Sequence, residues 1–124
     1  MPITRAADAQ VFEMHGTTFT SLIRPAAGSA ELCVWRIEIA PATTGVAHRV
    51  LREEAFVLLD GELTMVIDGE AADLKSGDAA IALAGSTIQL NNSAATPATV
   101  LVTAPVGFTG ELLDGTVVNP PWVN

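Results

Sequence analysis

Apolar and polar residues alternate over short stretches of this chain, and turn signals separate the stretches. In residues 33–39 the odd positions are apolar, and Arg36 and Glu38 occupy even positions. A period of two is that of a β-strand with one buried face, so the odd side chains should point inward. No stretch of convincing length shows the period of a helix. The pattern therefore predicts an all-β protein.

Applied along the chain, this interpretation predicts strands at 19–24, 32–40, 46–50, 54–59, 62–68, 70–74, 79–83, 87–92 and 98–103. Asp60-Gly61 and Asp68-Gly69 are candidates for two-residue hairpin turns, because glycine accepts a positive φ freely, and Asp114-Gly115 is a third. Short strands at even spacing, with no helices between them, are typical of a sandwich, a jelly roll or a small barrel.

Composition narrows the classes of partner. The chain has 124 residues, with 14 acidic and 6 basic side chains and a formal charge of -8, so a nucleic acid would be repelled. No apolar run is long enough for a membrane-spanning helix, and the N-terminus lacks the pattern of a signal peptide. Cys33 is the single cysteine, which excludes an internal disulfide. We expect one domain, soluble and cytoplasmic, with no membrane partner.

Residues 48–61 resemble the first motif of the cupin superfamily, G-x5-H-x-H-x3/4-E-x6-G. His48, Glu54 and Gly61 match it, whereas Val50 stands at its second histidine and Ala42 at its first glycine. The second motif is G-x5-P-x-G-x2-H-x3-N. Three residues of the chain match it and two differ from it. Its matching residues are Gly77, Gly85 and Asn92, and its departures are Leu83 for proline and Ile88 for histidine.

The resemblance implies a fold and an assembly. It covers roughly residues 32–105 and implies a double-stranded β-helix, the cupin-type jelly-roll barrel. Residues 9–24 would add N-terminal strands, and residues 107–124 would form a C-terminal flap. Small cupins commonly pair, so the resemblance also implies a homodimer, in which residues 10–23 could add a strand to a neighbour. Asn92 is expected near the rim of the barrel.

The resemblance also implies a divalent metal held by three histidines and one glutamate. Only His48 and Glu54 remain here, because Val50 and Ile88 supply no lone pair. Two protein donors leave most of a metal's shell to water, so binding should be weak. We therefore expect no metal and no other cofactor.

Strand parity predicts which side chains line the interior. The expected pocket for a small, mostly apolar ligand is lined by Trp35, Ile37, Val50, Phe56, Ile88, Leu90 and Val100. His48 and Glu54 are expected inside it, within hydrogen-bond or one-water range, as candidate catalytic residues for proton transfer of the isomerase, cyclase or lyase type. Three alternatives stay open. The pair could serve simple ligand binding, it could be a structural relic, or the protein could be a metalloenzyme with an unrecognised ligand.

Overall fold

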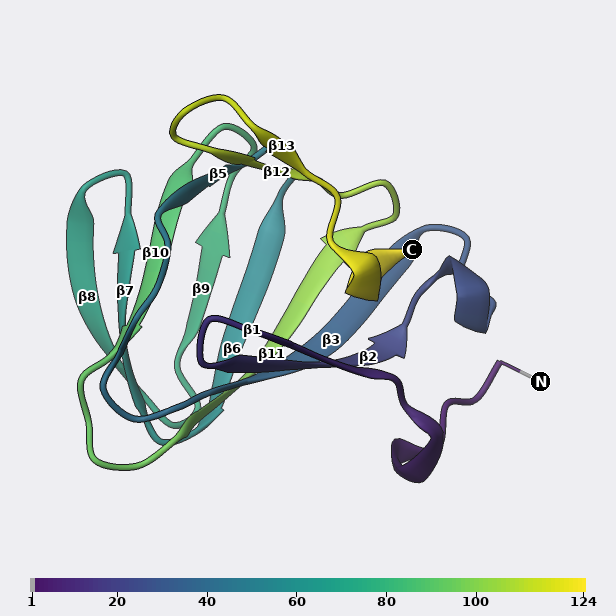
Figure 1. Ribbon diagram of the computed structural model, residues 1–124, viewed down its shortest axis with the longest axis horizontal. Coiled ribbons are helices and arrows are strands. Elements are labelled where there is room, and N and C mark those ends of the chain that lie inside the picture. Colours follow the sequence, from purple (N-terminus) through teal and green to yellow (C-terminus); the bar gives the residue numbers. More distant parts are fainter. Residues whose placement is uncertain (1) are drawn as a thin grey trace.

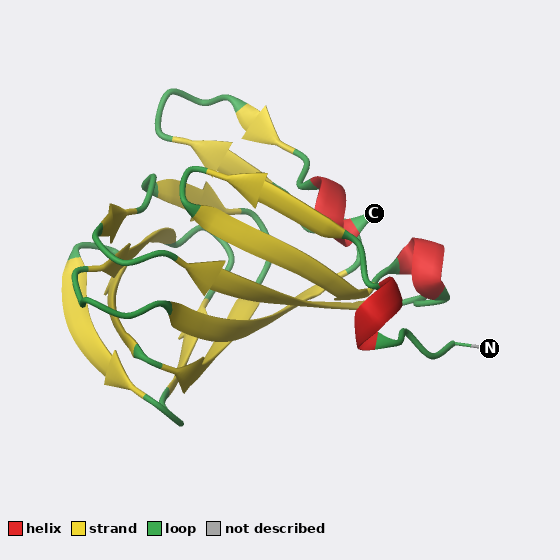
Figure 2. Cartoon of the chain, turned by 60° about the horizontal axis from the view of Figure 1, so that its bottom comes forward, coloured by secondary structure: helices red, strands yellow, loops and turns green. Residues whose placement is uncertain are grey.

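The computed structural model describes residues 2–124 and consists of two antiparallel sheets that face each other (Figures 1 and 2). Sheet A has the order β1 (Val11–Met14), β2 (Thr17–Ile23), β3 (Leu32–Ile39), β11 (Ala98–Pro105), β6 (Glu54–Asp60), β9 (Ala79–Ala82). Sheet B has the order β13 (Val117–Val118), β12 (Gly110–Leu112), β5 (His48–Val50), β10 (Thr87–Asn92), β7 (Glu62–Ile67), β8 (Glu70–Lys75), and β4 (Thr43–Thr44) also pairs with β10. This is the predicted all-β jelly roll.

The core lies between the two sheets and is filled by the side chains at alternate positions of their strands. In β3 the odd residues are buried while the even ones are half-buried or exposed, as the alternation predicted. β11 pairs with β3 along its whole length and buries its own even positions against the same core. Burial of these apolar faces is the main force that holds the sheets together. Within the described residues, the helices are three short 3-10 turns, and none could span a membrane.

The turn signals predicted one hairpin correctly and misassigned another. Asp68 and Gly69 both have positive φ, at 50° and 83°, and join β7 to β8 as a two-residue hairpin. Asp60-Gly61 is not a hairpin turn, because β6 belongs to sheet A and β7 to sheet B. There the chain crosses from one sheet to the other. Asp114-Gly115 lies in the loop between β12 and β13, which do pair.

The N-terminal strands add to their own sheet. β1 and β2 form a hairpin, β2 pairs with β3, and β1 is the edge strand of sheet A. The 3-10 turns η1 (Ala6–Asp8), η2 (Pro25–Ala27) and η3 (Pro121–Val123) gather at one end of the molecule, beside both termini (Figure 2). The homodimer stays a prediction.

The motif glycines that this chain keeps have backbone roles. Gly61, Gly77 and Gly85 have φ of 88°, 93° and 91°, a region that only glycine occupies readily. A Cβ on Gly61 would also lie 2.5 Å from the carbonyl oxygen of Pro97. These three positions therefore require glycine for the path of the chain.

Asn92 is the last residue of β10 and is only 1% exposed. Its Nδ2 donates to the carbonyl oxygens of Ile39 and Thr96 at 3.0 and 2.9 Å, and its Oδ1 accepts from the backbone N–H of Ala94 at 3.0 Å. A buried amide bonded in this way fixes the loop between β10 and β11. Its role is structural.

Ala42 stands at the first glycine position of the motif and has a φ of 55°. An L-residue in this region is strained by about 1–2 kcal/mol, and glycine loses slightly more chain entropy on folding. We expect Ala42→Gly to raise the free energy of unfolding by about 1 kcal/mol, the opposite of the usual effect of adding glycine. Urea unfolding measures this. Ala40→Gly, on a nearby residue without positive φ, is the control and should destabilise.

Candidate functional site

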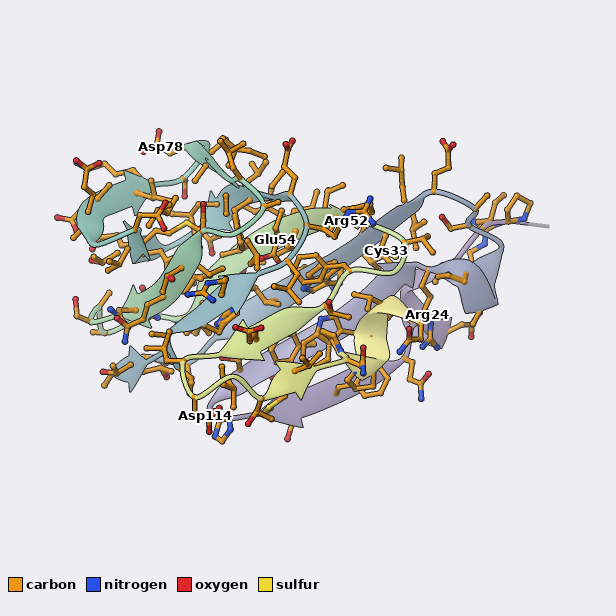
Figure 3. The ribbon with its side chains drawn as sticks, turned by 90° about the horizontal axis from the view of Figure 1, so that it is seen from above. Arg24, Cys33, Arg52, Glu54, Asp78 and Asp114 are labelled. Carbon is orange, nitrogen blue, oxygen red and sulfur yellow. The ribbon has the colours of Figure 1, made fainter. Side chains whose placement is uncertain are left out.

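Two of the site residues that the sequence predicts come from opposite sheets. His48 lies on β5 of sheet B, directly opposite Ile88 of β10 on one side and Leu112 of β12 on the other. Glu54 begins β6 of sheet A and is paired with Ala82 of β9. Figure 3, seen from above, labels Glu54 in the middle of the molecule, between the two sheets. Both residues lie on the inward-facing positions of their strands.

Glu54 is a buried acid. Its side chain has the same parity as Phe56 and Leu58, and the residue is only 5% exposed. Within the described part of the chain, its Oε1 has no hydrogen-bond partner. Burial penalises the carboxylate and raises the pKa of Glu54 to about 8. At neutral pH the group is therefore mainly a carboxylic acid, which can donate a proton or a hydrogen bond.

His48 is half-buried and is oriented by the backbone. Its Nδ1 lies 2.9 Å from the carbonyl oxygen of Val46. A carbonyl only accepts, so Nδ1 carries the proton and Nε2 of the neutral ring is a free acceptor. Among residues 2–124, His48 and Glu54 share neither a hydrogen bond nor an ion pair. The direct hydrogen bond between His48 and Glu54, one of the two arrangements that the sequence predicts, is not made.

The predicted pocket residues form a packed core. All seven face the interior, and six of them are at most 5% exposed. Those six are Trp35, Ile37, Val50, Phe56, Ile88 and Val100. Leu90 is half-buried and packs against them. Two surface hollows, of about 500 Å³ beside the N-terminal segment and about 220 Å³ along β7 and β8, are lined by other residues. The side chains predicted to line a pocket thus pack against one another.

The residues at the metal positions of the cupin motifs do not fit a metal. Val50 is fully buried and Ile88 is 2% exposed, and both present hydrocarbon to the interior. In the described residues no group of three or more histidine, cysteine, aspartate or glutamate side chains could hold an ion. A divalent transition metal needs at least three such donors to be held firmly.

The sequence interpretation missed part of the core, which comes from the C-terminal residues. Phe108, Trp122 and Val123 are 5%, 7% and 2% exposed and belong to the same cluster as the predicted pocket residues. Phe108 contacts Trp35, with ring centroids 6.0 Å apart. The presence of Trp122 in the proline-containing tail was the available signal. Nothing local indicated Phe108.

Comparison with solved structures gives the same architecture. The polyketide cyclase RemF from Streptomyces resistomycificus matches with a TM-score of 0.76 at 20% identity, over 94% of this chain and 82% of its own. An RmlC-like cupin from Shewanella frigidimarina NCIMB 400 matches with a TM-score of 0.73 at 15% identity, over 83% and 88%. KdgF from Halomonas sp. matches at 0.65 and 16% identity, over 79% and 86%. At these identities the likeness shows the fold alone.

The sequence comparisons give the family. No curated protein sequence matches this chain. The family model for the cupin domain matches residues 35–104, which is more than half of the 124 residues. The match includes His48, Glu54 and the glycines of both motifs. The chain therefore belongs to the cupin family.

Proposed function

We propose that this protein is a metal-independent acid/base enzyme that acts on a small, mostly apolar carbonyl compound. The observation that carries the proposal is Glu54, an inward-facing acid whose Oε1 lacks a partner within residues 2–124. An apolar site that keeps a carboxylic acid neutral turns it into a proton donor at pH 7. One structural neighbour, at 20% identity, is named a polyketide cyclase, and cyclisation is one of the reactions that such an acid could begin.

The proposed step is enolisation. The acid proton of Glu54 is transferred toward the carbonyl oxygen of the ligand, while Nε2 of His48 removes the proton on the adjacent carbon. The C–H electron pair becomes the C=C bond of the enol, and the C=O π pair becomes the new O–H bond. Isomerisation, aldol-type cyclisation and elimination can all begin in this way. Nε2 is the acceptor because Nδ1 is bonded to the carbonyl of Val46.

Hydrogen–deuterium exchange tests this step without knowledge of the natural substrate. We expect the protein to accelerate exchange of the α-protons of uncharged aryl ketones such as 1-tetralone, followed by proton NMR in D₂O. Glu54→Gln should lower the accelerated rate by about 10²-fold, the typical contribution of a positioned acid or base. Glu53→Gln is the matched control, because Glu53 is the exposed neighbour, and it should keep the rate. An equal rate in the Glu54→Gln variant and the wild type would refute the proposal.

The second candidate is a binding module without catalysis. It is favoured by the lack of a direct hydrogen bond between His48 and Glu54 in the described structure. In that case the same ketones would bind, and Glu54→Gln would change their affinity, but no exchange would be accelerated. If the pair is a structural relic, neither binding nor exchange will be seen. A metalloenzyme with an unrecognised ligand would show about one metal ion per chain by elemental analysis of protein purified without an affinity tag.

A further inference from the structure

The C-terminal residues 107–124, which we call the strap, close one end of the barrel. After β11 the backbone passes beside β5, where the N–H of Leu51 donates to the carbonyl oxygen of Thr109 at 3.2 Å. The strap then forms β12 and β13 and ends in η3, which contacts β1, β2 and β3. Figure 1 shows the β12–β13 hairpin across the top and η3 beside β3.

The side chains of the strap occupy interior volume. Trp122 stacks on Phe19 with ring centroids 3.7 Å apart, and it lies 6.3 Å from the ring of Phe12. Trp122, Val123 and Phe108 all belong to the buried cluster that includes Trp35 and Phe56. The sheets supply one part of the core and the strap supplies the rest.

The strap lies at the end of the barrel where Glu54 begins its strand. Cys33 pairs with Ala104, and its Sγ donates to the carbonyl oxygen of Val123 at 3.4 Å. Thr103 pairs with Ala55, so the next position in the antiparallel register places Ala104 beside Glu54. Cys33, Ala104 and Glu54 thus form one row across the inner face of sheet A, and η3 covers its first member. In Figure 3 the label of Cys33 lies above the yellow turn η3.

The hydrogen bonds that hold η3 leave one of its buried polar atoms without a partner among the described residues. Ser21 Oγ donates to the carbonyl oxygen of Trp122 at 2.9 Å, and Arg24 Nη1 donates to that of Pro121 at 3.3 Å. The indole Nε1 of Trp122 is buried without a hydrogen-bond partner among residues 2–124. An orphaned buried donor penalises the closed state, and it would regain water if η3 moved outward.

We propose that the strap is a gate, and that η3 must lift from Phe19 and Cys33 before a small apolar ligand enters the barrel. The inference rests on the proposed function in one respect, since it supposes that the interior is a binding site. In the closed state the side chains of Trp122 and Val123 occupy part of the space that the ligand would fill. Occupancy of the site is therefore coupled to displacement of the C-terminus.

The test uses prodan, an uncharged naphthalene ketone whose emission reports its surroundings. Ser21→Ala removes one bond that holds η3 closed, so we expect it to tighten prodan binding about fivefold, the worth of one net hydrogen bond. Thr20→Val is the matched control, because Thr20 pairs with Arg36 at an outward position of β2, and it should bind as the wild type does. Deletion of residues 120–124 should tighten binding at least tenfold.

A measurement on the full chain does not depend on how the deletion variant folds. With both tryptophans replaced by 5-fluorotryptophan, the ¹⁹F resonance of Trp122, assigned with Trp122→Phe, should become sensitive to H₂O/D₂O exchange when prodan saturates the protein. NOEs from prodan to the methyl groups of Ile88 would place it inside the barrel. The gate is refuted if Ser21→Ala binds prodan as the control does and the Trp122 resonance stays shielded. The gate is equally refuted if prodan gives NOEs only to Phe12 and Phe19, because these rings would be exposed by movement of η3 without entry into the barrel.

The outcome for the gate can be separated from that for the proposed function. Glu54→Leu removes the hydrogen-bond donor and should weaken prodan binding in the Ser21→Ala background about fivefold. If NOEs to Ile88 persist while Glu54→Leu leaves the affinity unchanged, the gate stands and the acid role of Glu54 fails. If Glu54→Leu weakens binding but the Trp122 resonance does not respond, the gate fails and the acid role stands.

Discussion

Raising the pH from 5.5 to 8.5 is expected to lower the free energy of unfolding of the wild-type protein by about 3 kcal/mol, and Glu54→Gln is expected to abolish most of this dependence. Glu54 is 5% exposed and burial raises its pKa to about 8, whereas a glutamate in the unfolded chain titrates near 4.5. The folded state therefore keeps a proton that the unfolded chain releases over this range.

The direction of this pH dependence follows from the number of protons that the folded and unfolded states bind. Between the two pKa values the native state binds more protons than the unfolded state, so stability falls as the pH rises. The loss begins above the ordinary pKa of a glutamate and levels off above pH 8, where both states have released the proton. The glutamine side chain of the variant has nearly the same shape and no proton to lose, so the stability of the variant should stay nearly level.

Urea unfolding at pH 5.5, 7 and 8.5 measures this difference. Glu53→Gln provides the matched control: it also removes one carboxylate, but from an exposed neighbour, and should keep the wild-type slope. A wild-type midpoint that does not change between pH 5.5 and 8.5 would mean that Glu54 is ionised in the native state. It would then be unable to act as the proton donor of the proposed reaction.

Strand parity and turn chemistry were readable in the sequence because both are local. The period of two along β3 identifies its buried face, and Asp68-Gly69 adopts the positive φ values that its composition favours. Asp60-Gly61 is the same dipeptide, but there the chain crosses from sheet A to sheet B. Whether a strand pairs with its predecessor or crosses to the other sheet depends on distant partners, such as the pairing of Asp60 with Thr99.

The sequence predicted which side chains of the candidate site point inward, but not whether an empty pocket remains between them. Parity correctly oriented Glu54, Val50 and Ile88 toward the interior. It could not show whether space remains between side chains, because that depends on what distant segments contribute. Here Phe108 and Trp122 come from the strap, whose short strands and 3-10 turn carry no clear period.

The two motifs combine positions that shape the backbone with positions that hold the metal, and this chain keeps part of each set. Gly61, Gly77 and Gly85 permit backbone conformations that other residues resist, and Asn92 fixes a loop. Four positions are substituted: Ala42 and Leu83 stand at backbone positions of the motifs, and Val50 and Ile88 stand at two of the four metal donors. A fold can keep its backbone requirements while its site changes chemistry.

If the backbone has kept the family's geometry, the double variant Val50→His, Ile88→His should bind a divalent metal. Val50 lies two residues from His48 on the same face of β5, and Ile88 lies directly opposite His48 on β10. The backbone of Val50 is also fixed, because its N–H donates to Ser86 and its carbonyl accepts from Gly85. Together with Glu54 the variant would offer four donors, enough for a closed site.

The expected effect is large and specific to the double variant. At a Zn²⁺ concentration about 1,000 times its dissociation constant, binding should stabilise the double variant by about 4 kcal/mol, while the wild type should barely respond. Without metal the double variant should be less stable than the wild type, because two polar rings replace hydrocarbon in the core. Urea unfolding with and without Zn²⁺ at pH 7.5, where free imidazoles are mainly neutral, measures both changes.

The control adds His48→Ala to the double variant, which removes one donor and should abolish most of the stabilisation by Zn²⁺. Failure of the double variant to bind stoichiometric metal, although folded, would show that its interior no longer has the family's geometry. One metal ion per chain in the wild type, lost on His48→Ala, would contradict the interpretation of a degenerate site. A donor outside the two motifs would then have to reach the interior, and the strap, whose Phe108 already contacts Trp35, is the segment placed to supply it.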